Sequence, residues 1–198
     1  MTLMQTLDAL RTRYAEPHRA YHTQAHLDAV LAGVAAARPG LSHPHAVELA
    51  TWYHDAVYDP ARTDNEECSA RLLEGELPGL VAAVQIGQAA SLVRATADHA
   101  LPPEMEPGLR ADAAVFLDLD MAVLGADPVS YDAYERGIAA EYIPVHGAER
   151  YRAGRAQFLR GMLARPRLFH TEAAHVALDP AARDNMRRAI AELHNGES

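Results

Sequence analysis

The chain is organised around the stretch Trp52-Tyr53-His54-Asp55-Ala56-Val57-Tyr58-Asp59. Here a histidine directly followed by an aspartate stands inside a largely apolar pattern. Read as a helix from His45 to Tyr58, the segment has a stripe at the three-and-four spacing of a core-facing surface, formed by Val47, Ala50, Thr51, His54, Val57 and Tyr58. A buried carboxylate is costly unless it is paired or bound to metal, so Asp55 either has a partner or is solvated beside a core histidine.

The composition predicts an all-α fold. The chain has 198 residues, of which 49% are hydrophobic and 23% are charged, which suits one soluble domain with a continuous core. Alanine and leucine are plentiful, β-branched residues are few, and no long run alternates with period two. We therefore expect a helical bundle without a domain boundary.

Charge and cysteine content exclude several classes of function. The formal net charge is -9 and no basic cluster interleaves with aromatic residues, so we expect no nucleic-acid partner. All 18 basic residues are arginines, which excludes Schiff-base lysines and a P-loop. Cys68 alone cannot form an internal disulfide, and no signal segment or membrane span is evident. The expected location is the cytoplasm, with no membrane partner.

Further histidines precede the central stretch. Pro17 is expected to open a helix that runs to Ala37, on which Arg19, His22 and His26 line one edge at three-then-four spacing. Two imidazoles one turn apart can share a metal, or one can bind metal while the other meets a substrate. The alternative is an amphipathic helix with histidines at its polar margin.

Two other polar positions have both a structural and a chemical interpretation. Thr63 and Glu66 match a capping box at a helix start, whereas Glu66 or Glu67 could relay protons beside a site. His99 ends a predicted helix, Leu80 to Asp98, where the helix dipole favours a cationic imidazole. From the same place His99 could also supply an extra ligand.

Two aspartates stand in a predicted helix from Leu109 to Gly125. Asp120 interrupts its apolar stripe, whereas Asp118 points about 160° away at about 100° per residue. We expect Asp120 to be the buried ligand and keep Asp118 in reserve, because a bend in the helix would exchange them.

Three further amphipathic helices are expected in the last third of the chain, at Tyr131 to Tyr142, Val145 to Ala164 and Pro180 to His194. Four of their side chains could reach a substrate phosphate or form surface salt bridges instead: Arg136, Tyr142, Arg155 and Arg160.

The order of one histidine, a His-Asp pair and a later aspartate resembles the HD-domain superfamily of metal-dependent phosphohydrolases. In particular, the chain is similar to the subgroup labelled predicted metal-dependent HD phosphohydrolase. The resemblance covers nearly the whole chain and is carried by residues 19–27, 52–59, 65–70, 95–99 and 116–125, with further similarity around Tyr142, residues 154–155 and residues 182–185. It implies one HD-like helical domain over residues 1–198, with the metal-site helices within about 18–125 and packing helices at 128–198.

The resemblance also implies a site. It assigns His26, His54, Asp55 and Asp120 as ligands of one divalent ion, with His22 as a rival for the first position. Such a mixed set accepts Mn²⁺, Fe²⁺, Co²⁺, Ni²⁺, Zn²⁺ or Mg²⁺, and the ion would activate a water for attack on phosphorus. Asp55 could orient that water.

The expected substrate is a small phosphate ester, for which a nucleotide is one candidate. Arg19, His22 and His99 are the candidates for neutralising its phosphoryl oxygens. Two alternatives stay open: an HD-fold di-iron oxygenase that uses His22 and His99 as extra ligands, and a nucleotide-sensing module without turnover.

Overall fold

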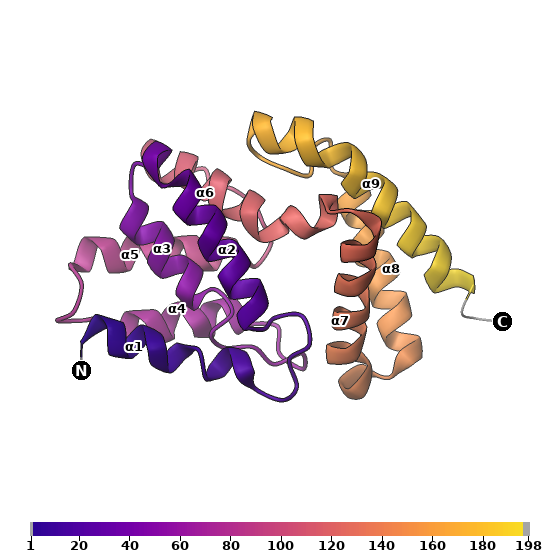
Figure 1. The fold of residues 1–198 in the computed structure, drawn as a ribbon, viewed down its shortest axis with the longest axis horizontal. Coiled ribbons are helices and arrows are strands. Elements are labelled where there is room, and N and C mark those ends of the chain that lie inside the picture. The colour runs from indigo at the N-terminus through magenta and orange to yellow at the C-terminus, as the bar shows by residue number, and fades with distance from the viewer. Residues whose placement is uncertain (1, 196–198) are drawn as a thin grey trace. The chain divides into compact units, whose positions relative to one another are not determined.

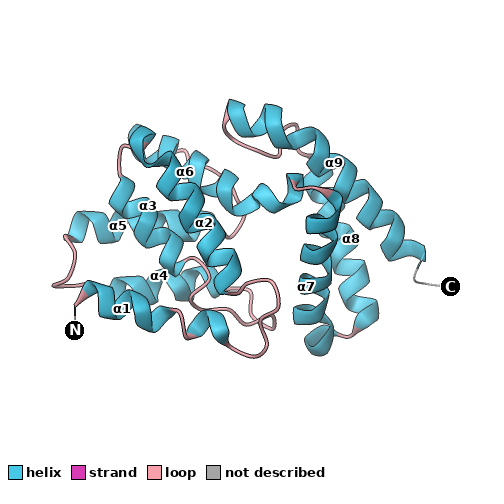
Figure 2. Ribbon diagram, in the orientation of Figure 1, coloured by secondary structure: helices cyan, strands magenta, loops and turns pink. Residues whose placement is uncertain are grey.

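Helices make up the regular structure of the computed structural model, which describes residues 2–195 (Figure 2). Within this range the β-structure is limited to one isolated bridge between Pro78 and Val81. The predicted all-α fold is therefore confirmed. Among the same residues, no helix combines the length and the hydropathy needed to span a bilayer.

The chain divides into two compact units, residues 1–119 and 120–198. Figure 1 labels the helices of the first unit, which are α1 (Leu3–Leu10), α2 (Gln24–Ala37), α3 (Pro44–Tyr53), α4 (Asn65–Glu76), α5 (Ala83–Ala95) and α6 (Pro107–Asp120). Short 3-10 turns, η1 (Arg13–Ala15) and η2 (Arg38–Gly40), follow α1 and α2. Asp120 ends α6 and begins the second unit, which contains η3 (Met121–Gly125), α7 (Pro128–His146), α8 (Ala148–Ala164) and α9 (Glu172–Asn195).

Helix α3 is central to the first unit because it packs against α1, α2, α4 and α5. It begins with Pro44 at a position where the missing N–H costs nothing. Val47, Ala50 and Tyr53 on its inner face are fully buried. Burying such apolar side chains stabilises the fold by about 1.5–3 kcal/mol for each large one.

The start of α3 is held by a residue of α6. Asp112, which is 2% exposed, accepts hydrogen bonds from the backbone N–H of Ser42 at 2.9 Å and of His43 at 2.6 Å. Its Oδ2 also lies 3.1 Å from His43 Nδ1. His43 is the N-cap of α3 without using its own side chain for capping, so the carboxylate of Asp112 joins the entry of α3 to α6.

Several predicted helix boundaries are wrong. Helix α3 ends at Tyr53 instead of Tyr58, because the chain beyond it bonds to α4: Val57 N–H donates to Ser69 Oγ at 3.0 Å. Helix α2 begins at Gln24 instead of Pro17, and residues 17–23 form turns. Arg19 and His22 therefore do not share a helix edge with His26.

The other predicted helices exist with shifted ends. The helix expected over Leu80 to Asp98 spans Ala83–Ala95. The helix expected to reach Gly125 becomes 3-10 after Asp120.

Two helices of the second unit are longer than the predicted ranges Tyr131 to Tyr142 and Pro180 to His194, and each contains a proline. Helix α7 starts where Asp127 accepts from the N–H groups of Val129 and Ser130, and it contains Pro144. Helix α9 begins at Glu172 and contains Pro180. Between α7 and α8, the Arg155 fork binds Glu135 at 2.7 and 3.1 Å, with the Arg155 side chain only 8% exposed. Arg160 donates to His194 Nε2 at 2.7 Å.

We predict that Asp112→Ala lowers the free energy of unfolding by about 3 kcal/mol, because it removes hydrogen bonds to a buried carboxylate from two backbone donors. Urea unfolding followed by far-UV circular dichroism measures the change. Asp28→Ala, which removes an exposed carboxylate paired with Arg11, is the matched control and should cost about 0.5 kcal/mol or less. Equal losses in the two variants would contradict the assigned role of Asp112.

Candidate metal centre

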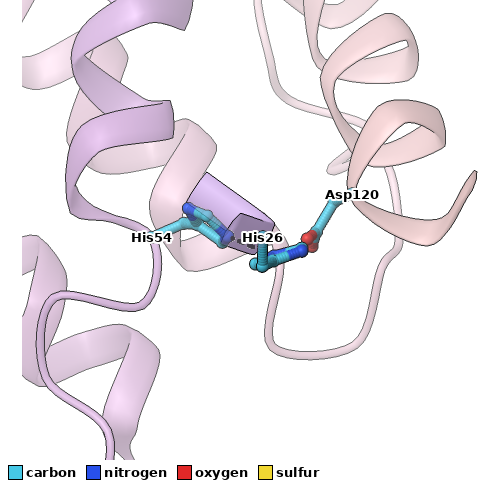
Figure 3. A group of neighbouring side chains, drawn as sticks. All are labelled: His26, His54 and Asp120. Atoms are coloured by element: carbon cyan, nitrogen blue, oxygen red, sulfur yellow. Dashed lines mark hydrogen bonds between the residues drawn. The ribbon is translucent and has the colours of Figure 1, made fainter. Parts of the chain in front are cut away.

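Three side chains bring one ligand atom each to a common point: His26, His54 and Asp120 (Figure 3). These atoms lie within 4.8 Å of one another. His26 belongs to the first turn of α2, His54 directly follows α3, and Asp120 is the last residue of α6. The two histidines are buried and Asp120 is half-buried. Of the predicted alternatives, the structure thus brings His26 and Asp120 together with His54.

The two imidazoles face each other through their Nε2 atoms, which are 3.0 Å apart. The other ring nitrogen of His54, Nδ1, lies 2.8 Å from the carbonyl oxygen of Thr51. A carbonyl oxygen accepts and never donates, so Nδ1 carries a proton and the neutral ring presents a bare Nε2. A ring held in this way by a backbone carbonyl is typical of metal-binding histidines.

The predicted ligand Asp55 is not part of this three-residue cluster, but its carboxylate lies close to both imidazoles. Its Oδ2 lies 3.1 Å from His54 Nε2 and 3.5 Å from His26 Nε2. This oxygen is buried and accepts no hydrogen bond among the described residues. Burial raises the pKa of Asp55, but the positive charge that His54, His22 and His26 carry when protonated outweighs this effect and holds its pKa well below the usual range. The carboxyl group is therefore an anion.

When both rings are neutral, a proton on His26 Nε2 can be shared with His54 Nε2, and Asp55 Oδ2 then stays unpaired, at a cost of about 1–3 kcal/mol. A divalent ion would satisfy Asp55 and both imidazoles at once. Nitrogen and oxygen donors about 2.0–2.2 Å from a Zn²⁺-like ion lie roughly 3.0–3.5 Å apart, which matches the distances between His26, His54 and Asp55. The residues fit a divalent ion, and the imidazoles favour a transition metal over Mg²⁺.

His22 and Asp118 lie outside the three-donor cluster. The His22 ring is half-buried, 4.2 Å from the ring of Tyr58 and 6.0 Å from that of His26, and it acts on the charge of Asp55. It therefore borders the centre without supplying one of the three clustered atoms. Asp118 is 5% exposed on α6 and is likewise not part of the cluster.

His99 and Glu66 are placed differently from their predictions. Helix α5 ends at Ala95, so His99 lies in a turn beyond it, with a positive φ of 51°, and the predicted stabilisation by the helix dipole does not hold. The N-cap of α4 is Asp64, so the predicted capping box of Thr63 and Glu66 is wrong. Glu66 is a half-buried residue in the first turn of α4.

Neighbouring charges also have structural roles. Glu67 accepts hydrogen bonds from Arg94 and Arg71, which lower its pKa to about 2, so it belongs to a surface ion-pair network. Arg19 has a fully buried side chain whose donors face Glu16 and backbone carbonyls. The predicted contact between Arg19 and a phosphoryl group is therefore not supported.

One contributor to the site was not foreseen from the sequence. Thr51 orients His54 through its carbonyl oxygen, which lies 2.8 Å from His54 Nδ1. The apolar stripe indicates that the two residues share a face, but it does not signal this bond.

Comparison of the chain with family models, with curated proteins and with solved structures gives no match.

We predict that His54 carries its proton on Nδ1 at neutral pH, because Nδ1 faces the Thr51 carbonyl. Long-range ¹H–¹⁵N correlation spectra of the ring distinguish the two nitrogens. His45, an exposed histidine at the start of α3, is the control and should show rapidly averaged ring signals. A proton fixed on His54 Nε2 would contradict the proposed donor set.

Proposed function

We propose that the protein is a metal-dependent phosphohydrolase that acts on a small phosphate ester such as a nucleotide. The observation that carries the metal centre is the buried, unpaired Oδ2 of Asp55 beside the Nε2 atoms of His54 and His26. The order of the same residues along the chain resembles that of HD-domain phosphohydrolases, which supports the reaction class.

His26, His54, Asp55 and Asp120 would hold the ion. When bound, a divalent ion there lowers the pKa of a water and withdraws charge from a phosphoryl oxygen. The residues of the chain would perform the remaining steps: they would orient the water, bind the phosphoryl group and transfer protons.

Three groups supply these functions. The carboxylate of Asp55, kept ionised by its neighbouring imidazoles, can accept a hydrogen bond from the attacking water and so orient it. His22 borders Asp55 with a half-buried ring, from which it can donate to a phosphoryl oxygen or to the leaving oxygen. Glu66 is the second residue of α4 and lies one turn before Ser69. Because Ser69 Oγ bonds to both N–H and C=O of Val57, the helix face that carries Glu66 packs on the segment after Asp55. Glu66 remains the candidate for proton transfer.

We predict that the protein binds one transition-metal ion per chain and hydrolyses nucleotides or related phosphate esters in its presence. His54→Ala and Asp55→Ala should each abolish bound metal and lower kcat/KM at least 10³-fold while the helical circular-dichroism signal persists. Elemental analysis, followed by phosphate release over a panel of esters with each divalent ion, measures both effects.

His45→Ala and Asp28→Ala change an exposed histidine and an exposed aspartate of the same unit and are the matched controls. Undiminished metal in the His54 or Asp55 variant would refute the donor set. Metal binding with oxygen uptake and a two-iron spectrum would indicate the oxygenase alternative instead. Tight nucleotide binding without phosphate release would indicate a sensing module.

Asp120→Asn and Asp118→Asn test the contribution of α6. Both residues lie near the C-terminal end of α6, but Asp120 alone belongs to the three-donor cluster. We expect Asp120→Asn to weaken metal binding 100-fold or more, because an amide is a poorer ligand than a carboxylate, and Asp118→Asn to change it less than 5-fold. Isothermal titration with Zn²⁺ or Mn²⁺ measures both affinities. The reverse ranking would assign the ligand to Asp118.

A further inference from the structure

We infer that Arg19 is a positioning residue that fixes the segment before α2 against the segment after α3, so that the ligands carried by both can meet at one ion. This inference rests on the proposed metal centre and assigns Arg19 a role away from the substrate.

The guanidinium group bonds to both segments at once. Arg19 Nη1 donates to the carbonyl oxygen of His22 at 3.0 Å and to that of Asp55 at 2.8 Å. Nη2 makes a longer contact of 3.5 Å with the carbonyl oxygen of Ala56, and Nε donates to Glu16 at 3.1 Å. One planar group thus joins the backbone four residues before His26 to the backbone directly after His54.

Aromatic rings enclose the same guanidinium. Its carbon lies 5.1 Å from the centroid of the Tyr14 ring and 5.2 Å from that of Tyr58. The Tyr14 hydroxyl donates to the carbonyl oxygen of Trp52 at 3.0 Å, which ties this ring to the last turn of α3. The ring of Tyr58 stands 4.2 Å from that of His22. With a side chain that is 0% exposed, Arg19 is a fixed part of the interior.

The hydrogen bonds of Arg19 fix backbone segments that lie outside the helices. His22 precedes α2, and Asp55 follows α3, so neither residue is placed by helical backbone bonds. A lysine ammonium carries the same charge but lacks the planar group whose Nε bonds to Glu16 while Nη1 bonds to both segments and whose face stacks against Tyr14 and Tyr58. The requirement at this position is therefore for arginine geometry and not for positive charge alone.

The test compares Arg19→Lys and Arg19→Ala with the whole unsubstituted chain, using Co²⁺ as the probe ion. We expect both variants to bind Co²⁺ 10–100-fold more weakly, as loss of an outer support for metal ligands typically does. The visible absorption bands of bound Co²⁺ should change in position or intensity, because they report ligand geometry. About 20 mM guanidinium, which is far below denaturing concentrations, should partly restore Co²⁺ affinity in Arg19→Ala.

Arg11→Lys and Arg11→Ala are the matched controls, because Arg11 also stacks on an aromatic ring, that of Trp52, but pairs with Asp28 at the surface. Both should leave Co²⁺ affinity and spectrum unchanged. A lower melting temperature in the Arg19 variants with unchanged Co²⁺ binding and spectrum would show a merely structural role and overturn the inference. Should Arg19→Ala not fold, Arg19→Lys decides. Absence of Co²⁺ binding by the unsubstituted chain would refute the metal centre itself, and with it this role.

Discussion

The carboxylate of Asp55 has a buried oxygen beside two imidazoles that accepts no hydrogen bond among the described residues, and the remainder of the site depends on how this oxygen is paired. An unpaired buried polar atom costs about 1–3 kcal/mol, a sizeable part of a net stability of about 5–15 kcal/mol. Unsatisfied groups of this kind are rare and are best explained by an ion or a chemical role.

The fold gathers the donors at helix ends and not along helix faces. His54 directly follows α3, and Asp120 is the last residue of α6, so two helix C-termini carry donors of the same cluster. The partial negative charge of a helix C-terminus favours a nearby cation by about 0.3–1 kcal/mol. His26 comes from an N-terminal turn, where the dipole has the opposite sign. Two of the three termini thus favour a cation.

Sequence reasoning was sound where it depended on composition, and weaker where periodicity and tertiary contacts decided. The helical class followed from the scarcity of β-branched residues. The apolar stripe of α6 predicted Asp120 as its buried aspartate, but Asp118 is 5% exposed whereas Asp120 is half-buried. The end of α3 could not be predicted from composition or spacing, because it depends on a tertiary contact. The N–H of Val57 donates to Ser69 Oγ of α4 instead of continuing the helical hydrogen bonds. Arg19 was misplaced for a similar reason. A spacing rule indicates which residues share a face, but it does not show that a guanidinium will bond to carbonyl oxygens 36 residues away.

The burial of Arg19 changes the electrostatics expected for substrate binding. Two carboxylates, Asp55 and Asp120, stand at the centre with two imidazoles, so without an ion the donors would repel a phosphate group. A divalent cation would cancel two negative charges, and Arg19 would not add to it, since its donors are used within the protein. Under the proposed function, attraction for a phosphoryl group would then have to come from the ion and from His22. In a chain of net charge -9, such a site would favour compact phosphate esters over extended polyanions.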